Sequence, residues 1–156
     1  MKKRLALLLA LLLLLPAVLG CNVDRTPIDA ATFQTKAEEA GLLVLDAADQ
    51  VDEGVVDAWL IAVAGDDSID YQIEFIIVPT EAQAINAYQE NYATFEGKKG
   101  GTSSYASTTM GNFAYYKLTT NGRYYVISRI GNTFIYVDAP ETYRTAINDF
   151  LKGIGY

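Results

Sequence analysis

The chain has 156 residues, of which 51% are hydrophobic and 20% charged, a composition typical of one folded domain rather than a disordered tail. It contains one cysteine and no histidine, which excludes an internal disulfide, Ser-His-Asp and Cys-His nucleophiles, and zinc sites of the usual nitrogen and sulfur type. The formal net charge of −7 argues against nucleic acid as a partner, because phosphate contacts need a basic surface.

The N-terminal segment has the pattern of an export signal. Basic residues 2–4 precede an unbroken run of Leu and Ala over residues 5–15, and the small residue Gly20 precedes Cys21. The apolar stretch is shorter than the roughly 20 residues of a spanning helix, and Pro16 interrupts it, so a permanent membrane span is the less favoured interpretation. We expect residues 1–20 to be a cleaved signal peptide.

The tetrapeptide Val18-Leu19-Gly20-Cys21 resembles the bacterial lipobox, although the usual order is a Leu followed by a smaller residue. The resemblance implies that the Cys21 sulfur is lipidated and that the chain is cut before it. Two acyl chains then supply the two signals that stable membrane anchoring needs. Residues 21–27 would form the lipidated cysteine and a short tether, and residues 28–156 a single domain. An ordinary cleaved signal with a free thiol is the alternative.

The first predicted helix begins after Asp29, which can cap it. Ile28 and Phe33 have the spacing of a hydrophobic staple, and Gly41 is the expected stop. A short strand is predicted next, over residues 42–46.

Two long antiparallel strands are predicted over residues 55–64 and 69–78, joined by the turn 65–68. A second helix should start at the capping box Thr80–Gln83 and end at Gly97. Its expected apolar stripe consists of Ile85, Tyr88, Tyr92 and Phe95.

Four short strands should follow, punctuated by glycine-containing turns, over residues 103–109, 113–120, 123–130 and 133–138. Asn121-Gly122 between alternating runs is a strong hairpin signal. A last helix is predicted from Pro140 to Gly153, with inward residues Tyr143, Ile147, Phe150 and Leu151. The expected fold is therefore α+β: an antiparallel sheet of hairpins and a C-terminal meander, with about three packed helices.

The hairpin at Asn121-Gly122 gathers tyrosines on both faces of the sheet. Its register places Tyr116, Leu118, Tyr125 and Ile127 on one face and Tyr115, Lys117, Tyr124, Val126 and Ser128 on the other. Core packing is the favoured interpretation. The alternative is an exposed recognition surface, for which the candidate binding residues are Tyr115, Lys117 and Tyr124.

No catalytic residues can be assigned from the sequence. Five acids over residues 46–57 are expected to be solvated rather than to bind calcium, because their spacing differs from that of an EF-hand loop. The segment 97–102 lacks the strand-before, helix-after context of a phosphate loop. Glu74, inside a strand, is a candidate ion-pair partner for Lys117 or Arg129. We expect no cofactor and no metal.

Charge is unevenly distributed in the part of the chain after the predicted signal. Residues 22–96 hold sixteen acidic and two basic side chains, whereas residues 97–156 hold three acidic and seven basic ones. We expect the two halves to attract each other within one fold. A field that steers a cationic partner is the alternative.

The segment Tyr124–Thr133, together with the lipobox and the Gly155-Tyr156 end, resembles small surface lipoproteins of Gram-positive bacteria. The resemblance implies a location, the extracytoplasmic face of the cell membrane, and no activity. We expect a non-enzymatic binding or accessory role at the cell envelope, with the membrane and an envelope protein or small ligand as partners. An immunity-type or inhibitor-type interaction module is the alternative, and a carboxylate-dependent cell-wall or carbohydrate enzyme is less favoured.

Overall fold

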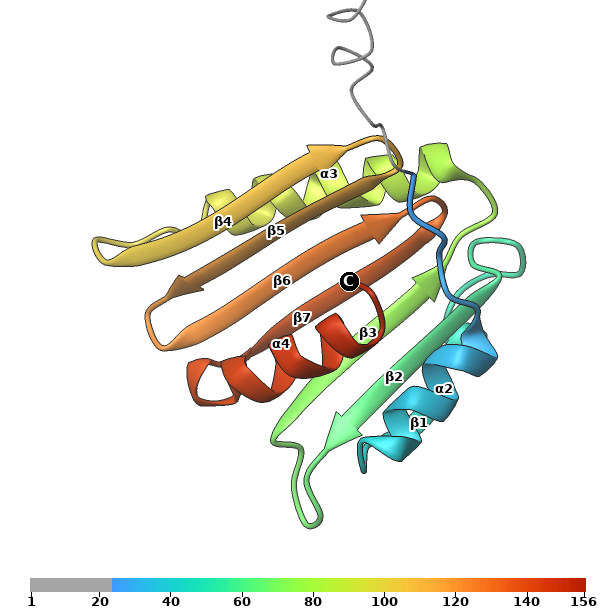
Figure 1. The fold of residues 1–156 in the computed structure, drawn as a ribbon, viewed down its shortest axis with the longest axis horizontal. Coiled ribbons are helices and arrows are strands. Elements are labelled where there is room, and N and C mark those ends of the chain that lie inside the picture. The colour runs from blue at the N-terminus through green and yellow to red at the C-terminus, as the bar shows by residue number, and fades with distance from the viewer. Residues whose placement is uncertain (1–23) are drawn as a thin grey trace, which may run out of the picture.

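The computed structural model describes residues 24–156, which form a seven-stranded antiparallel sheet with three α-helices (Figure 1). The strand order across the sheet is β1-β2-β3-β7-β6-β5-β4. The strands are β1 (Leu43–Asp46), β2 (Ala58–Ala64), β3 (Tyr71–Ile77), β4 (Ser103–Met110), β5 (Phe113–Thr120), β6 (Arg123–Ile130) and β7 (Thr133–Pro140). The predicted α+β class, with its C-terminal meander, is confirmed.

The three helices are α2 (Ala30–Glu39), α3 (Glu81–Glu96) and α4 (Arg144–Gly153). Two of the predicted caps are present. The Asp29 side chain accepts a hydrogen bond from the Thr32 backbone N–H at 2.7 Å, and Thr80 and Gln83 form the reciprocal capping box of α3.

The helices cover the two faces of the sheet unequally. Helices α2 and α4 lie on one face, in front of the sheet in Figure 1, and α3 lies on the other. Under α2 and α4 the core includes Phe33, Phe75 and Ile147, and the Phe33 and Phe75 rings stack with centroids 4.6 Å apart. Under α3 a smaller core is built around Phe95 and Tyr116. The sheet is therefore the middle layer of three.

The Asn121-Gly122 hairpin has the predicted register, with Thr120 opposite Arg123 and Leu118 opposite Tyr125. Both turn residues have positive φ, 50° at Asn121 and 72° at Gly122, as a two-residue type I′ turn requires. The register therefore fixes which tyrosines lie under α3 and which lie under α4.

Several predicted boundaries are wrong by a few residues. Strand β3 begins at Tyr71 rather than Ile69, because the connection after β2 is longer than the predicted four-residue turn. Strand β2 begins at Ala58 rather than Val55, because its pairing with β3 starts at Ala58, opposite Ile77. Helix α4 begins at Arg144 rather than Pro140. Pro140 still pairs with Arg123 at the end of β7, and the 3-10 turn η3 (Glu141–Tyr143) comes between the two elements.

The first described residues lie on the domain rather than apart from it. The Asp24 carboxylate accepts a hydrogen bond from the Asn112 backbone N–H at 3.3 Å, and the Arg25 N–H donates to the Asn112 side chain at 2.9 Å. A Cβ on Gly111, where φ is +55°, would lie 2.6 Å from the Asp24 carboxylate, so this close approach depends on glycine. The predicted tether over residues 21–27 is thus bound to the β4–β5 turn from Asp24 onward.

The predicted signal peptide over residues 1–20 and the predicted lipidation at Cys21 lie outside the described residues. Within residues 24–156, none of the helices has both the length and the apolar character that crossing a membrane requires.

Candidate functional site

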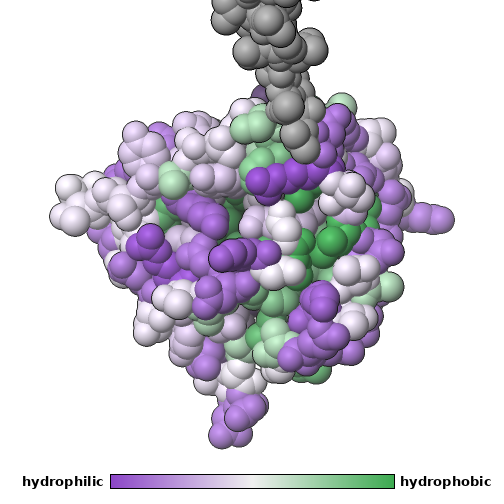
Figure 2. Space-filling model, in the orientation of Figure 1, coloured by the Kyte–Doolittle hydropathy of each residue, from purple (hydrophilic) through white to green (hydrophobic). Residues whose placement is uncertain are grey.

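Two regions of the sheet lack a covering helix, one on each face. On the face of α4, strands β4 and β5 extend beyond the helix and present mostly small or polar side chains. We call this region the polar shelf; it consists of Ser104, Ala106, Thr108, Tyr115, Lys117 and Thr119. In Figure 2, hydrophilic and weakly polar residues lie over the half of this face that holds β4 and β5, and a more hydrophobic strip lies toward α2.

The shelf contains two of the three residues predicted as a binding surface, and the third forms its wall. Tyr115 and Lys117 are half-buried on β5, with the Lys117 Nζ 5.6 Å from the centre of the Tyr115 ring. Tyr124 is only 2% exposed and belongs to the core beneath α4. The structure therefore divides the predicted set: Tyr124 is a core residue whose hydroxyl reaches the shelf, and the other two lie on the shelf itself.

Asn148 of α4 connects the wall to the shelf. Its side-chain oxygen accepts hydrogen bonds from the Lys117 ammonium and from the Tyr124 hydroxyl, both at 2.8 Å. Its side-chain amide donates to the Arg144 backbone oxygen at 2.9 Å, one helical turn earlier. Because the oxygen receives two donors, the amide orientation is unambiguous and Asn148 is fixed in place.

Arg144, in the first turn of α4, brings a second positive charge to the same place. Its guanidinium carbon lies 5.7 Å from the centre of the Tyr124 ring. Burial lowers the pKa of the Lys117 ammonium, and the nearby Arg144 charge lowers it further. Burial also raises the pKa of the Tyr124 hydroxyl, against the opposing influence of the hydrogen bond to Asn148. The Tyr124 hydroxyl is therefore a neutral donor at physiological pH.

These side chains line a hollow of about 170 Å³. Its residues come from β4, β5, β6 and α4; they are Ser104, Tyr105, Ala106, Lys117, Thr119, Tyr124, Arg144 and Asn148. Within the described part of the chain, none of the lining residues is acidic, and neither Lys117 nor Arg144 forms an ion pair. The hollow is therefore a cationic site on an acidic protein.

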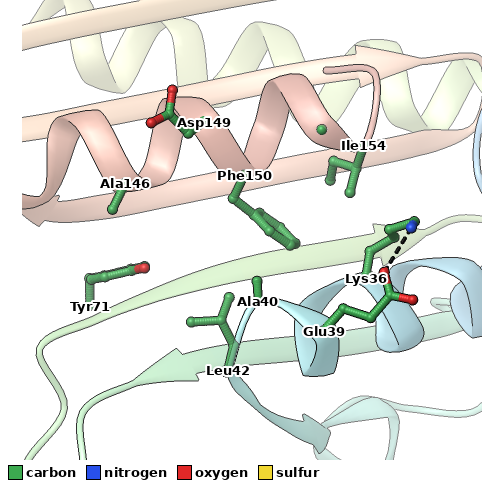
Figure 3. Close-up of a pocket in the computed structure, with 10 residues that line it drawn as sticks. Lys36, Glu39, Ala40, Leu42, Tyr71, Ala146, Asp149, Phe150 and Ile154 are labelled. Carbon is green, nitrogen blue, oxygen red and sulfur yellow. Dashed lines mark hydrogen bonds and ion pairs between the residues drawn. The ribbon is translucent and has the colours of Figure 1, made fainter.

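A larger open groove, of about 490 Å³, runs between α2 and α4 (Figure 3). Its floor is apolar: Leu42 follows the end of α2, Phe150 projects from α4, and Tyr71 comes from β3. Its rim carries the Lys36–Glu39 ion pair, with nitrogen and oxygen 2.7 Å apart. Because Lys36 already has an acidic partner within the helix, the rim offers no free cation comparable with Lys117.

The second region without a helix lies on the face of α3, over strands β1 to β3. We call it the apolar face; it consists of Leu43, Leu45, Trp59, Ile61 and Ile76, with Glu74 among them. The Glu74 carboxylate accepts hydrogen bonds from Trp59 Nε1 at 3.1 Å and from Gln72 Nε2 at 3.3 Å. Burial raises its pKa, and these two hydrogen bonds oppose the rise.

The predicted ion pair of Glu74 with Lys117 or Arg129 is wrong. Glu74 faces the side of α3, whereas Lys117 faces the side of α4, and Arg129 pairs with Glu81 at 2.7 Å.

Arg144 and Asn148 were missed by the sequence analysis. Their spacing of one helical turn was visible, but nothing in the sequence indicated that this face of the last helix would lie beside β5.

Within residues 24–156, no group of three or more acidic or cysteine side chains is arranged to hold a metal ion. The acids over residues 46–57 therefore do not converge on a common point. The hydrogen-bonding groups around Lys117 can bind and orient an anion.

We compared the chain with models of protein families, with curated proteins and with solved structures, and none of them matches it.

Proposed function

We propose that this protein is a lipid-anchored, extracytoplasmic binding protein of the cell envelope, without enzymatic activity of its own. The observation that carries the proposal is the position of its one cysteine, Cys21, directly after the small residue Gly20 and the apolar run of a signal segment. Lipidation at this sulfur would hold the domain at the outer side of the cytoplasmic membrane.

The contacts of Asp24 and Arg25 support a defined orientation of such an anchored domain. Asp24 is three positions after Cys21, so the backbone between them spans about 11 Å at most. Since Asp24 and Arg25 are bonded to the Asn112 turn, an anchor on Cys21 would hold that end of the sheet beside the bilayer. Thr119 lies seven residues farther along β5, roughly 20 Å away, so the Thr119 end of the polar shelf would lie away from the bilayer.

The test is the Cys21→Ser variant of the full chain expressed in a bacterium. The wild-type protein should be found in the membrane fraction with an acylated N-terminal cysteine by mass spectrometry, and the variant should be released or should accumulate unprocessed. Thr26→Ala, an exposed change that leaves the cysteine in place, is the control. A Cys21→Ser protein that stays membrane-bound at its normal mature mass would refute the lipid anchor.

A second candidate function, an inhibitor-type or immunity-type interaction module, is favoured by the apolar face. Leu43 and Leu45 are 63% and 46% exposed on strand β1, beside the half-buried Trp59. Exposed apolar patches mark contacts with partners more often than scattered apolar residues do. A photo-crosslinker at position 43 should then capture a single envelope protein in intact cells. The same crosslinker at Tyr105, which is also 63% exposed but lies on β4, is the matched control.

A further inference from the structure

We propose that the hollow on the polar shelf is a binding site for a small oxyanion, a carboxylate or phosphate group, held by Lys117 and Arg144. The inference deepens the proposed binding function and names the chemical class of the ligand. It depends on the described domain alone, and it would stand even if Cys21 were not lipidated.

The first argument is the charge around the hollow. The described domain has nineteen acidic and nine basic residues, so most cations have acids available to pair with. Four of the nine do so: Lys36, Lys99, Arg123 and Arg129. Five form no ion pair in the described part of the chain, and among these Lys117 and Arg144 lie next to each other at one hollow, with Lys117 half-buried. Two like charges held together destabilise the fold unless an anion joins them.

The second argument is the supply of hydrogen-bond donors. The Lys117 ammonium has three N–H groups, and Asn148 accepts a hydrogen bond from one of them. Within residues 24–156, no other hydrogen bond from this ammonium is formed. Ser104 and Thr119, which carry hydroxyls, line the same hollow, and so does Arg144. Ammonium, guanidinium and hydroxyl donors are the groups that bind a carboxylate or phosphate, and the residues that carry them line one hollow here.

The third argument is size and position. Pockets for drug-sized ligands are typically about 300–1,000 Å³, so a hollow of about 170 Å³ accommodates an anionic group but not a large ligand around it. The rest of a larger ligand would lie across the open shelf, along Ala106 and Thr108, which offer small side chains and no charge. The hollow, rather than the whole shelf, is at the Ser104–Thr119 end of these strands, away from the Asn112 turn that holds the tether, so the anionic group would bind at the end away from the tether.

The test uses the purified full chain in a non-ionic detergent, titrated with inorganic phosphate and separately with acetate at constant ionic strength. Amide chemical shifts measured by NMR should move and saturate at Ser104, Lys117 and Thr119. Lys117→Met should weaken binding about tenfold or more, because it removes a charge-assisted hydrogen bond. Arg144→Gln, at an exposed position, should weaken it up to about fivefold.

Lys152→Gln is the matched control, since it removes the same charge from the exposed surface of the same helix. Its affinity should equal that of the wild type. Shifts that do not saturate, or an equal loss of affinity in Lys152→Gln and Arg144→Gln, would show general electrostatic attraction and overturn the inference.

Two further measurements separate the possible origins of the signal. The Lys117→Met variant should melt at the same temperature as the wild type or higher, because it removes a half-buried cation beside Arg144. A clearly lower melting temperature would mean that Lys117 stabilises the fold, and would overturn its role in binding. Cosedimentation with phosphatidylglycerol vesicles distinguishes a lipid phosphate from a soluble one. Lys117-dependent sedimentation would support the same site with a lipid head group as its ligand.

Discussion

The polar shelf and the apolar face are the two uncovered ends of one sheet, and each contains one half-buried charge. On the shelf it is Lys117, beside edge strand β4; on the apolar face it is Glu74, two strands from edge strand β1. Burial lowers the pKa of Lys117 and raises the pKa of Glu74, and both shifts favour the neutral form of the side chain. The difference between the regions lies in what surrounds each charge.

Glu74 is satisfied by its own chain, because Trp59 and Gln72 donate hydrogen bonds to its two carboxylate oxygens. Lys117 donates one hydrogen bond to Asn148, but the nearby positive charge of Arg144 repels its own charge. A buried charge alone therefore does not indicate a ligand site. A buried charge that the chain leaves partly unsatisfied, and places beside a like charge, does.

The edge strands of the two regions differ in the same way. Strand β4 has the sequence Ser-Ser-Tyr-Ala-Ser-Thr-Thr-Met, which is mostly polar, whereas β1 has the sequence Leu-Val-Leu-Asp. An apolar edge with unpaired backbone groups can add a strand from another chain, and a polar edge does so less readily. The shelf is therefore suited to a small polar ligand and the apolar face to a protein surface.

The largest expected effect on stability is the difference between substituting Tyr124, in the wall of the shelf, and Tyr115, in its floor. Tyr124→Ala should lower the free energy of unfolding by about 3–5 kcal/mol, because the ring is wholly buried under α4. Tyr115→Ala, on the half-exposed floor, should cost about 1 kcal/mol or less. Urea unfolding of the two variants measures the difference. Equal losses would mean that the tyrosines are not divided between core and shelf as described.

Replacing both tyrosines together would consequently test folding rather than binding. Tyr124→Phe is the sharper variant for the site, because it keeps the ring and removes only the hydroxyl that donates to Asn148. Its cost should be about 1 kcal/mol, the usual value for one hydrogen bond.

A smaller effect, with a distinct pH signature, is expected at Glu74. Its pKa in the folded protein is raised above the ordinary value of 4.5, so the carboxyl stabilises the fold fully below that value, and the contribution is lost as the pH rises through the raised pKa. Glu74→Gln should therefore gain stability relative to the wild type at pH 7 and lose that gain near pH 4.5. Thermal unfolding across this range measures it, and a constant difference between the two proteins would contradict the burial of a charged Glu74.

Most of the fold could be predicted from local signals. Alternation over residues 113–130, the Asn121-Gly122 turn and the Thr80–Gln83 capping box are short-range features, and each has the predicted structure. The starts of β2 and α4 could not be predicted as well. Val55 and Pro140 are compatible with their predicted elements, and only the pairing of neighbouring strands determines that β2 begins later and that β7 continues through Pro140.

The site could be predicted only in part, for a related reason. The Asn121-Gly122 turn predicts the hairpin register, and that register places Lys117 and Tyr124 on one face of the sheet. That Tyr124 is buried while Lys117 is half-open depends on where α4 crosses the sheet, and so does the approach of Arg144 and Asn148. The position of a helix across a sheet is set by long-range packing, and the sequence of α4 alone carries no signal for it.

The smallest expected effect on stability lies at the apolar edge. Leu45→Lys should change the free energy of unfolding by no more than about 0.5 kcal/mol, because the side chain is 46% exposed at the rim of the sheet. It should nevertheless reduce concentration-dependent association measured by light scattering, since a lysine on an edge strand opposes strand addition. Thr108→Lys on edge strand β4 is the control and should leave association unchanged. If both variants reduce association equally, net charge rather than the apolar edge controls it, and the contrast between the two ends of the sheet does not extend to their partners.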